Sequence, residues 1–281
     1  MNPLPTSYTE HVVVFHEGLI GVRCQPQRPS SRPMALLSNA GLLGRAGANR
    51  LNVELARALA CAGIPSFRFD LSGLGDSLAR TDSVPFSESM VEETRAAMDA
   101  MSDHAARFIP MGLCSGADQA FQVGVVDERV IGAVLVDGYP YITPGFRLRQ
   151  LARPLRDPSA WRRMMRSGKR PSVLLRAFAR RATAVGDEGM EVRDIPPIEI
   201  TAAGFESMLS RGISLLVVYS AGQLGSFNGE AQFYEMHPRL RRRPELTYRY
   251  LADADHTFTL PPARRELINL IVRWWPDSPE A

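Results

Sequence analysis

The sequence predicts an α/β fold in which a mostly parallel β-sheet is covered by helices on both faces. The first observation is an alternation of short apolar runs with longer segments whose apolar residues recur at helical spacing. The second is a glycine-rich turn at 111–117, which joins one such run to a helix. The third is size, because 281 residues with 45% hydrophobic side chains can bury the core of one large domain.

The expected elements follow one another in the order that a helix-covered sheet requires. The chain opens on two apolar runs separated by a short turn, a pattern typical of a hairpin. Later apolar runs are short and bounded by turn-forming residues, as buried strands are. Strands are expected at 10–15, 19–23, 33–38, 64–70, from 108, 130–136, 213–219 and 246–251, and helices at 50–62, 87–104, from about 115, and at 264–275.

The turn at 111–117 reads MGLCSGA and has the spacing of a nucleophile elbow, a sharp strand-to-helix turn with an exposed central side chain. Gly112 and Gly116 flank Cys114 symmetrically, so Cys114 is the central residue. Ser115 would be central only with glycines at 113 and 117, where the chain has Leu and Ala. The pattern predicts a thiol nucleophile; the alternative is a buried small cysteine beside glycines that let the helix pack closely.

Together with its neighbours, this turn resembles the α/β-hydrolase fold across nearly the whole chain. The loop 39–42, the Asp-x-x-Gly-x-Gly-x-Ser turn that begins at Asp70 and a histidine after the last strand carry the resemblance. Within that superfamily, the Asn-Ala-Gly loop, the segment RAGANR at 45–50 and the Gly-Leu-Cys elbow resemble the exosortase-associated hydrolases of bacteria. Gly44 departs from that branch, which has a histidine there. The Asp70 turn is expected to shape the loop beside the pocket.

Thiol chemistry requires a partner base. A cysteine is nucleophilic as the thiolate, which a helix N-terminus and a neighbouring histidine both favour. His256 follows the strand at 246–251, in the chain order of nucleophile, acid and histidine that the fold implies. The alternative for His256 is a surface-loop histidine. The remaining histidines lack this context and metal-ligand spacing, so neither a metal nor another cofactor is expected.

The acid of the expected triad departs from the family pattern, because Gln223 stands where an aspartate would follow the strand at 213–219. Three alternatives remain. Asp137, at the end of the strand at 130–136, can serve as a relocated acid; Glu230 can reach back from the loop; or Gln223 can orient the imidazole without any acid. We favour Asp137. The oxyanion hole is expected to use the backbone N–H of Ser115 and that of Leu42 or Gly41.

The segment 138–211 is expected to be a helical cap inserted into a core formed by 1–137 and 212–281. Between 147 and 181 it carries twelve basic residues and one acidic residue, Asp157. Such a run is either a solvated face or a site for an anion. If it binds an anion, Arg162, Arg163 and Arg166 are the candidates, and the partners are coenzyme A, an acyl carrier protein or, as peripheral contact, lipid headgroups.

Composition excludes several other classes. No apolar stretch approaches the length of a membrane span, and the N-terminus lacks the apolar core of a signal peptide. No nucleic-acid module accompanies the basic run. Three cysteines without metal-like spacing suit a reducing cytoplasm, and we expect Cys24 and Cys61 to pack in the core.

These observations predict a cysteine-dependent acyl-transfer enzyme, similar to a thioesterase or acyltransferase, that acts on an acyl thioester or ester through an acyl-Cys114 intermediate. Two alternatives stay open. One is an esterase or lactonase resembling dienelactone hydrolase, which also uses an elbow cysteine. The other is a binding protein without activity, for which Gln223 in place of the acid is the positive evidence.

Overall fold

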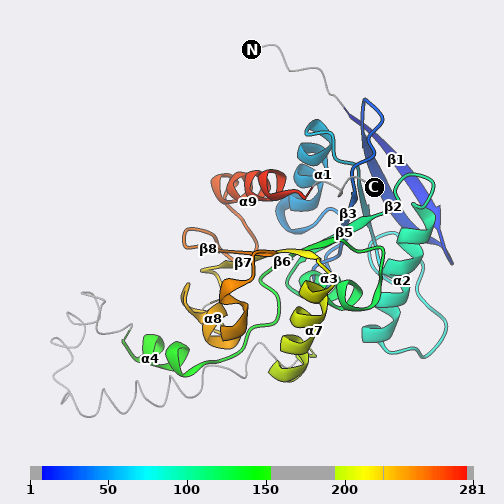
Figure 1. Cartoon of the computed structure of the whole chain (residues 1–281). Helices are drawn as coiled ribbons and strands as arrows, with labels where there is room; N and C mark the ends of the chain where they lie inside the picture. Colours follow the sequence, from blue (N-terminus) through cyan, green and yellow to red (C-terminus); the bar gives the residue numbers. More distant parts are fainter. Residues whose placement is uncertain (1–7, 153–193, 224, 277–281) are drawn as a thin grey trace, which may run out of the picture.

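The computed structural model describes residues 8–152, 194–223 and 225–276. Its centre is a sheet in which eight strands of the described residues lie in the order β1-β2-β4-β3-β5-β6-β7-β8 (Figure 1). The β1–β2 and β2–β4 pairs are antiparallel and the other pairs are parallel. The strands are β1 (Tyr8–Phe15), β2 (Leu19–Pro26), β3 (Met34–Leu37), β4 (Ser66–Phe69), β5 (Phe108–Leu113), β6 (Gly132–Val136), β7 (Ser214–Ser220) and β8 (Leu246–Leu251).

Helices cover both faces of this sheet, as the sequence predicts. Helices α1 and α9 bury their apolar sides against one face, while α2, α3 and α7 pack on the other (Figure 1). The helices are α1 (Leu51–Cys61), α2 (Phe86–Ala100), α3 (Ser115–Val126), α4 (Pro144–Ala152), α7 (Ile198–Ser210), α8 (Gln232–Met236) and α9 (Pro261–Trp274), with short 3-10 turns at Ala48–Arg50 (η1) and Pro238–Arg242 (η3). Because β3 to β8 are parallel, their carboxyl ends lie at one edge of the sheet. The segments that follow them there are 39–47, 70–77, the elbow residue 114, 137–143, 221–223 with 225–231, and 252–260.

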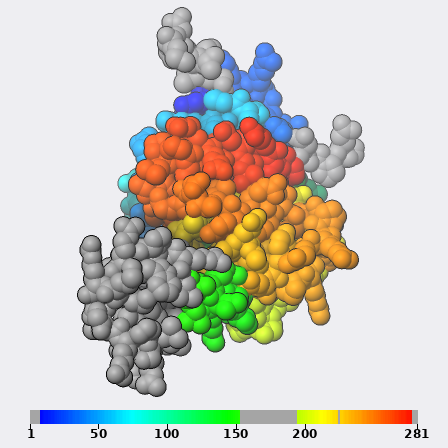
Figure 2. All heavy atoms as spheres, turned by 90° about the vertical axis from the view of Figure 1, so that its left-hand side faces the viewer, coloured from blue at the N-terminus to red at the C-terminus, as the bar shows by residue number. Residues whose placement is uncertain are grey.

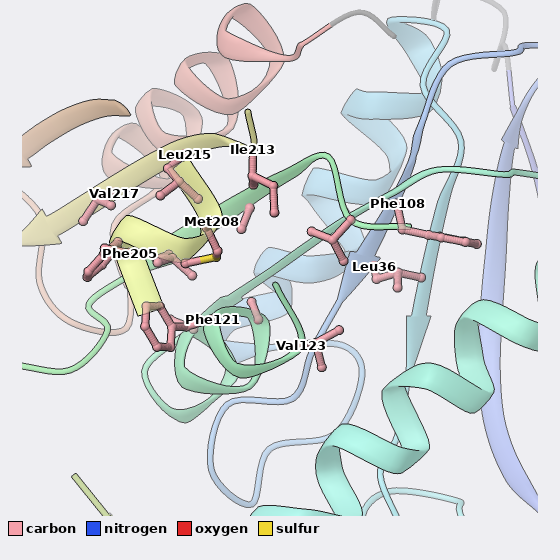
Figure 3. Close-up of a cluster of buried hydrophobic side chains, with 14 of the residues drawn as sticks. Leu36, Phe108, Phe121, Val123, Phe205, Met208, Ile213, Leu215 and Val217 are labelled. Carbon is pink, nitrogen blue, oxygen red and sulfur yellow. The ribbon is translucent and has the colours of Figure 1, made fainter. Parts of the chain in front are cut away.

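The core on the α3 face is continuous from the middle of the sheet to α7. Figure 3 shows side chains of β3, β5 and β7 meeting those of α3 and α7 in this cluster. The rings of Phe121 and Phe205 lie 5.0 Å apart in an edge-to-face arrangement. Buried aliphatic and aromatic surface of this kind is the main stabilising contribution to folding, and it fixes the position of α3, which begins directly after the elbow.

The segment expected to form the cap is described only at its two ends. Helix α4 is tied to α8 by Arg149, which pairs with Glu235 at 2.6 Å, and Figure 2 shows the two regions side by side. Helix α7 packs on α3 and contributes Phe205, Met208 and Leu209 to the core. Residues 153–193, including Arg162, Arg163 and Arg166, lie outside the described residues, so the division into core and cap stays a prediction.

The two non-elbow cysteines differ in environment. Cys24 lies on β2 and is buried, as expected, and burial raises the pKa of its thiol to about 11. Cys61 is exposed, so its assignment to the core was wrong. It is the last residue of α1 and lies on the outward face of the helix, together with Glu54 and Arg57, while the neighbouring Leu59 and Ala60 are buried. No helix among the described residues is long and apolar enough to cross a membrane.

Candidate active site

Cys114 sits at the junction of β5 and α3 in a strained backbone conformation, with φ 58° and ψ −123°. The two flanking glycines are required by close approach. A Cβ on Gly112 would collide with the backbone of Gly116, and a Cβ on Gly116 would collide with the carbonyl oxygen of Asn39. This is the elbow that the glycine spacing predicts, and it leaves the Cys114 side chain half-buried at the head of α3.

Substituting Gly116 with alanine tests this packing. The added methyl group meets main-chain atoms that cannot turn aside, so we expect a loss of about 1–3 kcal/mol in the free energy of unfolding. Gly225 is the matched control, because a Cβ there has no neighbour within 4 Å among the residues that the structure describes. Urea unfolding of both alanine variants measures the difference; equal stabilities would contradict a cramped elbow.

His256, in the loop after β8, joins the elbow to an acid. Its Nδ1 lies 2.8 Å from Oδ2 of Asp137, and it also forms a hydrogen bond with Cys114. The bond to Asp137 first, and the bond to Cys114 second, raise the pKa of His256 to about 9, against the lowering effect of its burial. Cys114, His256 and Asp137 thus form one hydrogen-bonded chain of thiol, imidazole and carboxylate.

Asp137 is fully buried directly after β6 and has a left-handed φ of 50°. Its carboxylate accepts hydrogen bonds from the backbone N–H and the hydroxyl of Ser220, both at 2.7 Å, in addition to the bond with His256. Its own N–H donates to the Val218 carbonyl at 2.8 Å. These contacts satisfy a buried anion and hold it against the imidazole. Ser220 was not singled out from the sequence, because only the pairing of β6 with β7 brings it to Asp137.

The two other candidates for the acid position occupy different places. Gln223 donates from Nε2 to the Asp137 carbonyl at 3.1 Å, and the same Nε2 lies 3.4 Å from Nδ1 of His256. Since Nδ1 carries the proton that it shares with Asp137, the amide lies against the ring without replacing the acid. Glu230 is exposed, and its backbone carbonyl accepts the hydroxyl of Tyr248. None of the described hydrogen bonds connects Glu230 to His256.

The expected oxyanion donors lie around the elbow, with one change. The N–H of Ser115 belongs to the first turn of α3, where N–H groups have no partner within the helix. The Gly41 N–H donates to the Ser115 hydroxyl at 2.7 Å, so it is engaged in this structure. Leu42 follows in the same loop with its side chain 90% exposed. The Ser115 hydroxyl therefore holds the loop to the elbow, a contact that the sequence does not reveal.

Asp70 shapes that loop, as expected from its turn. It is fully buried and pairs with Arg45, and its Oδ1 accepts Nδ2 of Asn39 at 3.2 Å. Asn39 in turn donates to the Leu43 carbonyl at 2.9 Å and accepts the Leu71 N–H at 2.9 Å. The loops after β3 and β4 are therefore one hydrogen-bonded unit beside the elbow.

Solved structures share this arrangement of strands and helices. The esterase Pf2001 of Pyrococcus furiosus aligns with 98% of this chain and 93% of its own, at 14% identity and a TM-score of 0.59. A serine hydrolase homologue of Coxiella burnetii aligns over 96% and 99%, at 15% identity and a TM-score of 0.57. The thioesterase domain of the curacin biosynthetic pathway aligns over 94% and 99%, at 16% identity and a TM-score of 0.52. The chain has the α/β-hydrolase fold.

At these identities the likeness establishes the fold alone. No family model matches the sequence, and no curated protein does. Within the α/β-hydrolase fold, the chain places its buried carboxylate after β6, and an amide follows β7 at the usual position of the acid. The cysteine at the elbow and the relocated carboxylate are thus properties of this chain, and their roles have to be argued from its own geometry.

Proposed function

We propose that this protein is a cysteine-dependent acyl-transfer enzyme that forms an acyl-Cys114 intermediate. The observation that carries the proposal is the hydrogen-bonded chain of Cys114, His256 and Asp137 at the head of α3. An imidazole whose pKa is raised to about 9 is an imidazolium at neutral pH. Its hydrogen-bonded neighbour and the start of a helix both favour a thiolate, so the pair is poised for nucleophilic attack.

The geometry supports a two-step reaction. The Cys114 thiolate adds to the substrate carbonyl, and the negative oxygen that forms is held by the N–H of Ser115 and that of Leu42. When the carbonyl reforms, the leaving thiolate or alkoxide departs and takes a proton from His256. Water or another acceptor then attacks the acyl-cysteine, gives its proton to His256 and restores the thiolate on release of the acyl group. Asp137 keeps Nδ1 protonated and Nε2 directed at the sulfur throughout.

The substrate class follows from the nucleophile. A thiolate exchanges acyl groups readily with thioesters, and structures with this fold include ones described as a thioesterase domain and an esterase. We infer an acyl thioester as the donor, carried by coenzyme A or an acyl carrier protein, with the basic run 147–181 as its anion-binding surface. A reactive thiol also favours a reducing compartment such as the cytoplasm.

Ester or lactone hydrolysis is the second candidate. The same thiolate and oxyanion donors accept an activated ester, and an elbow cysteine of this kind is expected in an enzyme resembling dienelactone hydrolase. A purely binding function has less support from the structure than it had from the sequence alone. Its positive evidence was Gln223 in place of the acid, and the 2.8 Å contact between the Asp137 carboxylate and His256 weakens that evidence.

Intact-protein mass spectrometry tests the proposal. The protein is mixed with acyl-N-acetylcysteamine and acyl-coenzyme A thioesters of different chain lengths, alongside the Cys114→Ala and Ser115→Ala variants. We expect a mass gain equal to one acyl group that is lost in Cys114→Ala and kept in Ser115→Ala. An adduct that requires Ser115 would make serine the nucleophile. Turnover of aryl esters and lactones without any thioester adduct would favour the second candidate.

A further inference from the structure

The segment 45–50, singled out by its resemblance, has no role in the chemistry proposed above. It leads from the loop after β3 into α1 and contains two successive non-glycine residues in the left-handed region. Asn49 has φ 49° and Arg50 has φ 63°. Such residues cost free energy and persist where the surrounding structure holds them. The first of the two, Asn49, is of the residue type that tolerates this conformation best after glycine.

The Asn49 side chain reaches the loop that carries the histidine. Its Nδ2 donates to the carbonyl oxygen of Thr257 at 3.0 Å, across a separation of 208 residues. Thr257 is the residue immediately after His256. The hydrogen bond therefore connects the β3–α1 loop to the main chain next to the imidazole.

The rest of the histidine loop is held from other directions. Asp255 accepts the N–H groups of Thr257 at 3.0 Å and of Thr259 at 3.1 Å, which sets the local turn. Phe258 is fully buried and anchors the loop in the core. On the β7 side, Gly222 approaches so closely that a Cβ there would collide with the His256 backbone. Asn49, just before α1, adds a further support through the Thr257 carbonyl.

The other end of the segment is fixed as well. Arg45 pairs with the buried carboxylate of Asp70, which also holds Asn39. The segment 45–50 thus spans from the loop that supplies the oxyanion donors to the loop that supplies the base. Asn49, whose backbone is strained, lies between these two contacts, so a movement of one loop is expected to displace the other.

We propose that Asn49 is a positioning residue that holds the His256 loop so that the imidazole faces the Cys114 sulfur. This inference rests on the proposed function, because it assigns Asn49 a role through the cysteine–histidine pair. Without the bond to Thr257, the main chain beside His256 keeps its other contacts but loses the one that ties it to the β3–α1 loop, and it can shift slightly. A shift of a few tenths of an ångström weakens the contact between ring and sulfur and so reduces the thiolate population at neutral pH.

The experiment compares Asn49→Gly with Arg50→Gly. Glycine adopts a positive φ without strain, so both variants are expected to fold, and only the first removes the bond to Thr257. Cys114 is alkylated with iodoacetamide between pH 5 and 10 and quantified by peptide mass spectrometry. We expect Asn49→Gly to move the midpoint of the Cys114 profile up by about one pH unit and to lower kcat on a thioester about tenfold with KM unchanged. Arg50→Gly should retain the wild-type profile.

Each outcome bears on one hypothesis. An Asn49→Gly profile that superimposes on the wild type overturns the positioning role and leaves the proposed function intact. Equal shifts in both variants also overturn it, because relief of backbone strain would then account for the effect. A wild-type protein whose Cys114 reacts only at alkaline pH, and which forms no acyl adduct, contradicts the proposed function itself.

Discussion

The Asp137→Asn variant is expected to lose about three to four orders of magnitude in kcat while keeping its fold. The asparagine oxygen can still accept the Ser220 N–H, and its amide can donate to the Ser220 hydroxyl, so the contact between β6 and β7 is maintained. Towards His256, the amide presents a donor in place of an acceptor. The imidazole then takes the tautomer with its proton on Nε2, and the Cys114 sulfur loses its base. Single-turnover acylation measures the loss.

A second substitution can return the carboxylate. Gln223 has the same length as glutamate, and its Nε2 lies 3.4 Å from Nδ1 of His256. We expect the Asp137→Asn, Gln223→Glu double variant to react at least about tenfold faster than Asp137→Asn alone. Glu230→Gln is the control and should match the wild type, because Glu230 is exposed and makes no described contact with His256. Full activity in Asp137→Asn would remove Asp137 from the mechanism.

Replacing the nucleophile should reverse the dependence of the reaction on pH. In the wild type, His256 must be protonated so that it can give a proton to the leaving group, and its pKa is raised to about 9. The protonated form is populated below that value, so acylation should hold from neutral pH and fall as pH rises through about 9. In Cys114→Ser the hydroxyl is not ionised, and the reaction needs neutral imidazole as a base. Its rate should be at least about 10³-fold lower at pH 7 and should rise with pH.

Rapid-quench acylation between pH 5.5 and 10 compares the two enzymes. The raised pKa of His256 depends first on Asp137 and second on Cys114, so the serine variant retains part of the elevation and its rising limb lies below pH 9. Profiles of the same shape in both proteins would contradict a thiolate–imidazolium pair. Ser115→Ala is a suitable companion, since its hydroxyl contacts the Gly41 loop and its loss should lower the rate without changing the slope.

The order of strands and helices, the elbow and His256 could be read from the sequence because their signals are local. Glycines at fixed spacing, apolar runs and the residue that follows the last strand need no knowledge of distant partners. The identity of the acid could not be decided in this way. Asp137 and Gln223 both end near His256, and they differ in the contacts that the folded chain gives them: Asp137 Oδ2 lies 2.8 Å from Nδ1 and Gln223 Nε2 lies 3.4 Å from it.

Two further contacts could not be predicted from the sequence for the same reason. The bonds from Gly41 to Ser115 and from Asn49 to Thr257 join segments separated by 74 and 208 residues, and no periodicity encodes them. The prediction that Cys61 packs in the core was wrong for a local reason: Cys61 shares the outward face of α1 with Glu54 and Arg57, at the spacing of one helix face.

The position of Asp137 also bears on how this protein can change. Residues that perform chemistry commonly weaken a fold, so that replacing them gains stability at the expense of activity. Here the same carboxylate binds His256 and fastens the end of β6 to the end of β7 through Ser220. At this residue the usual opposition between activity and stability is absent, and drift to a side chain that can neither bind His256 nor accept the Ser220 N–H is penalised twice. A lineage that abandons catalysis on this scaffold would therefore be free to lose Cys114 long before it could lose the polar side chain at 137.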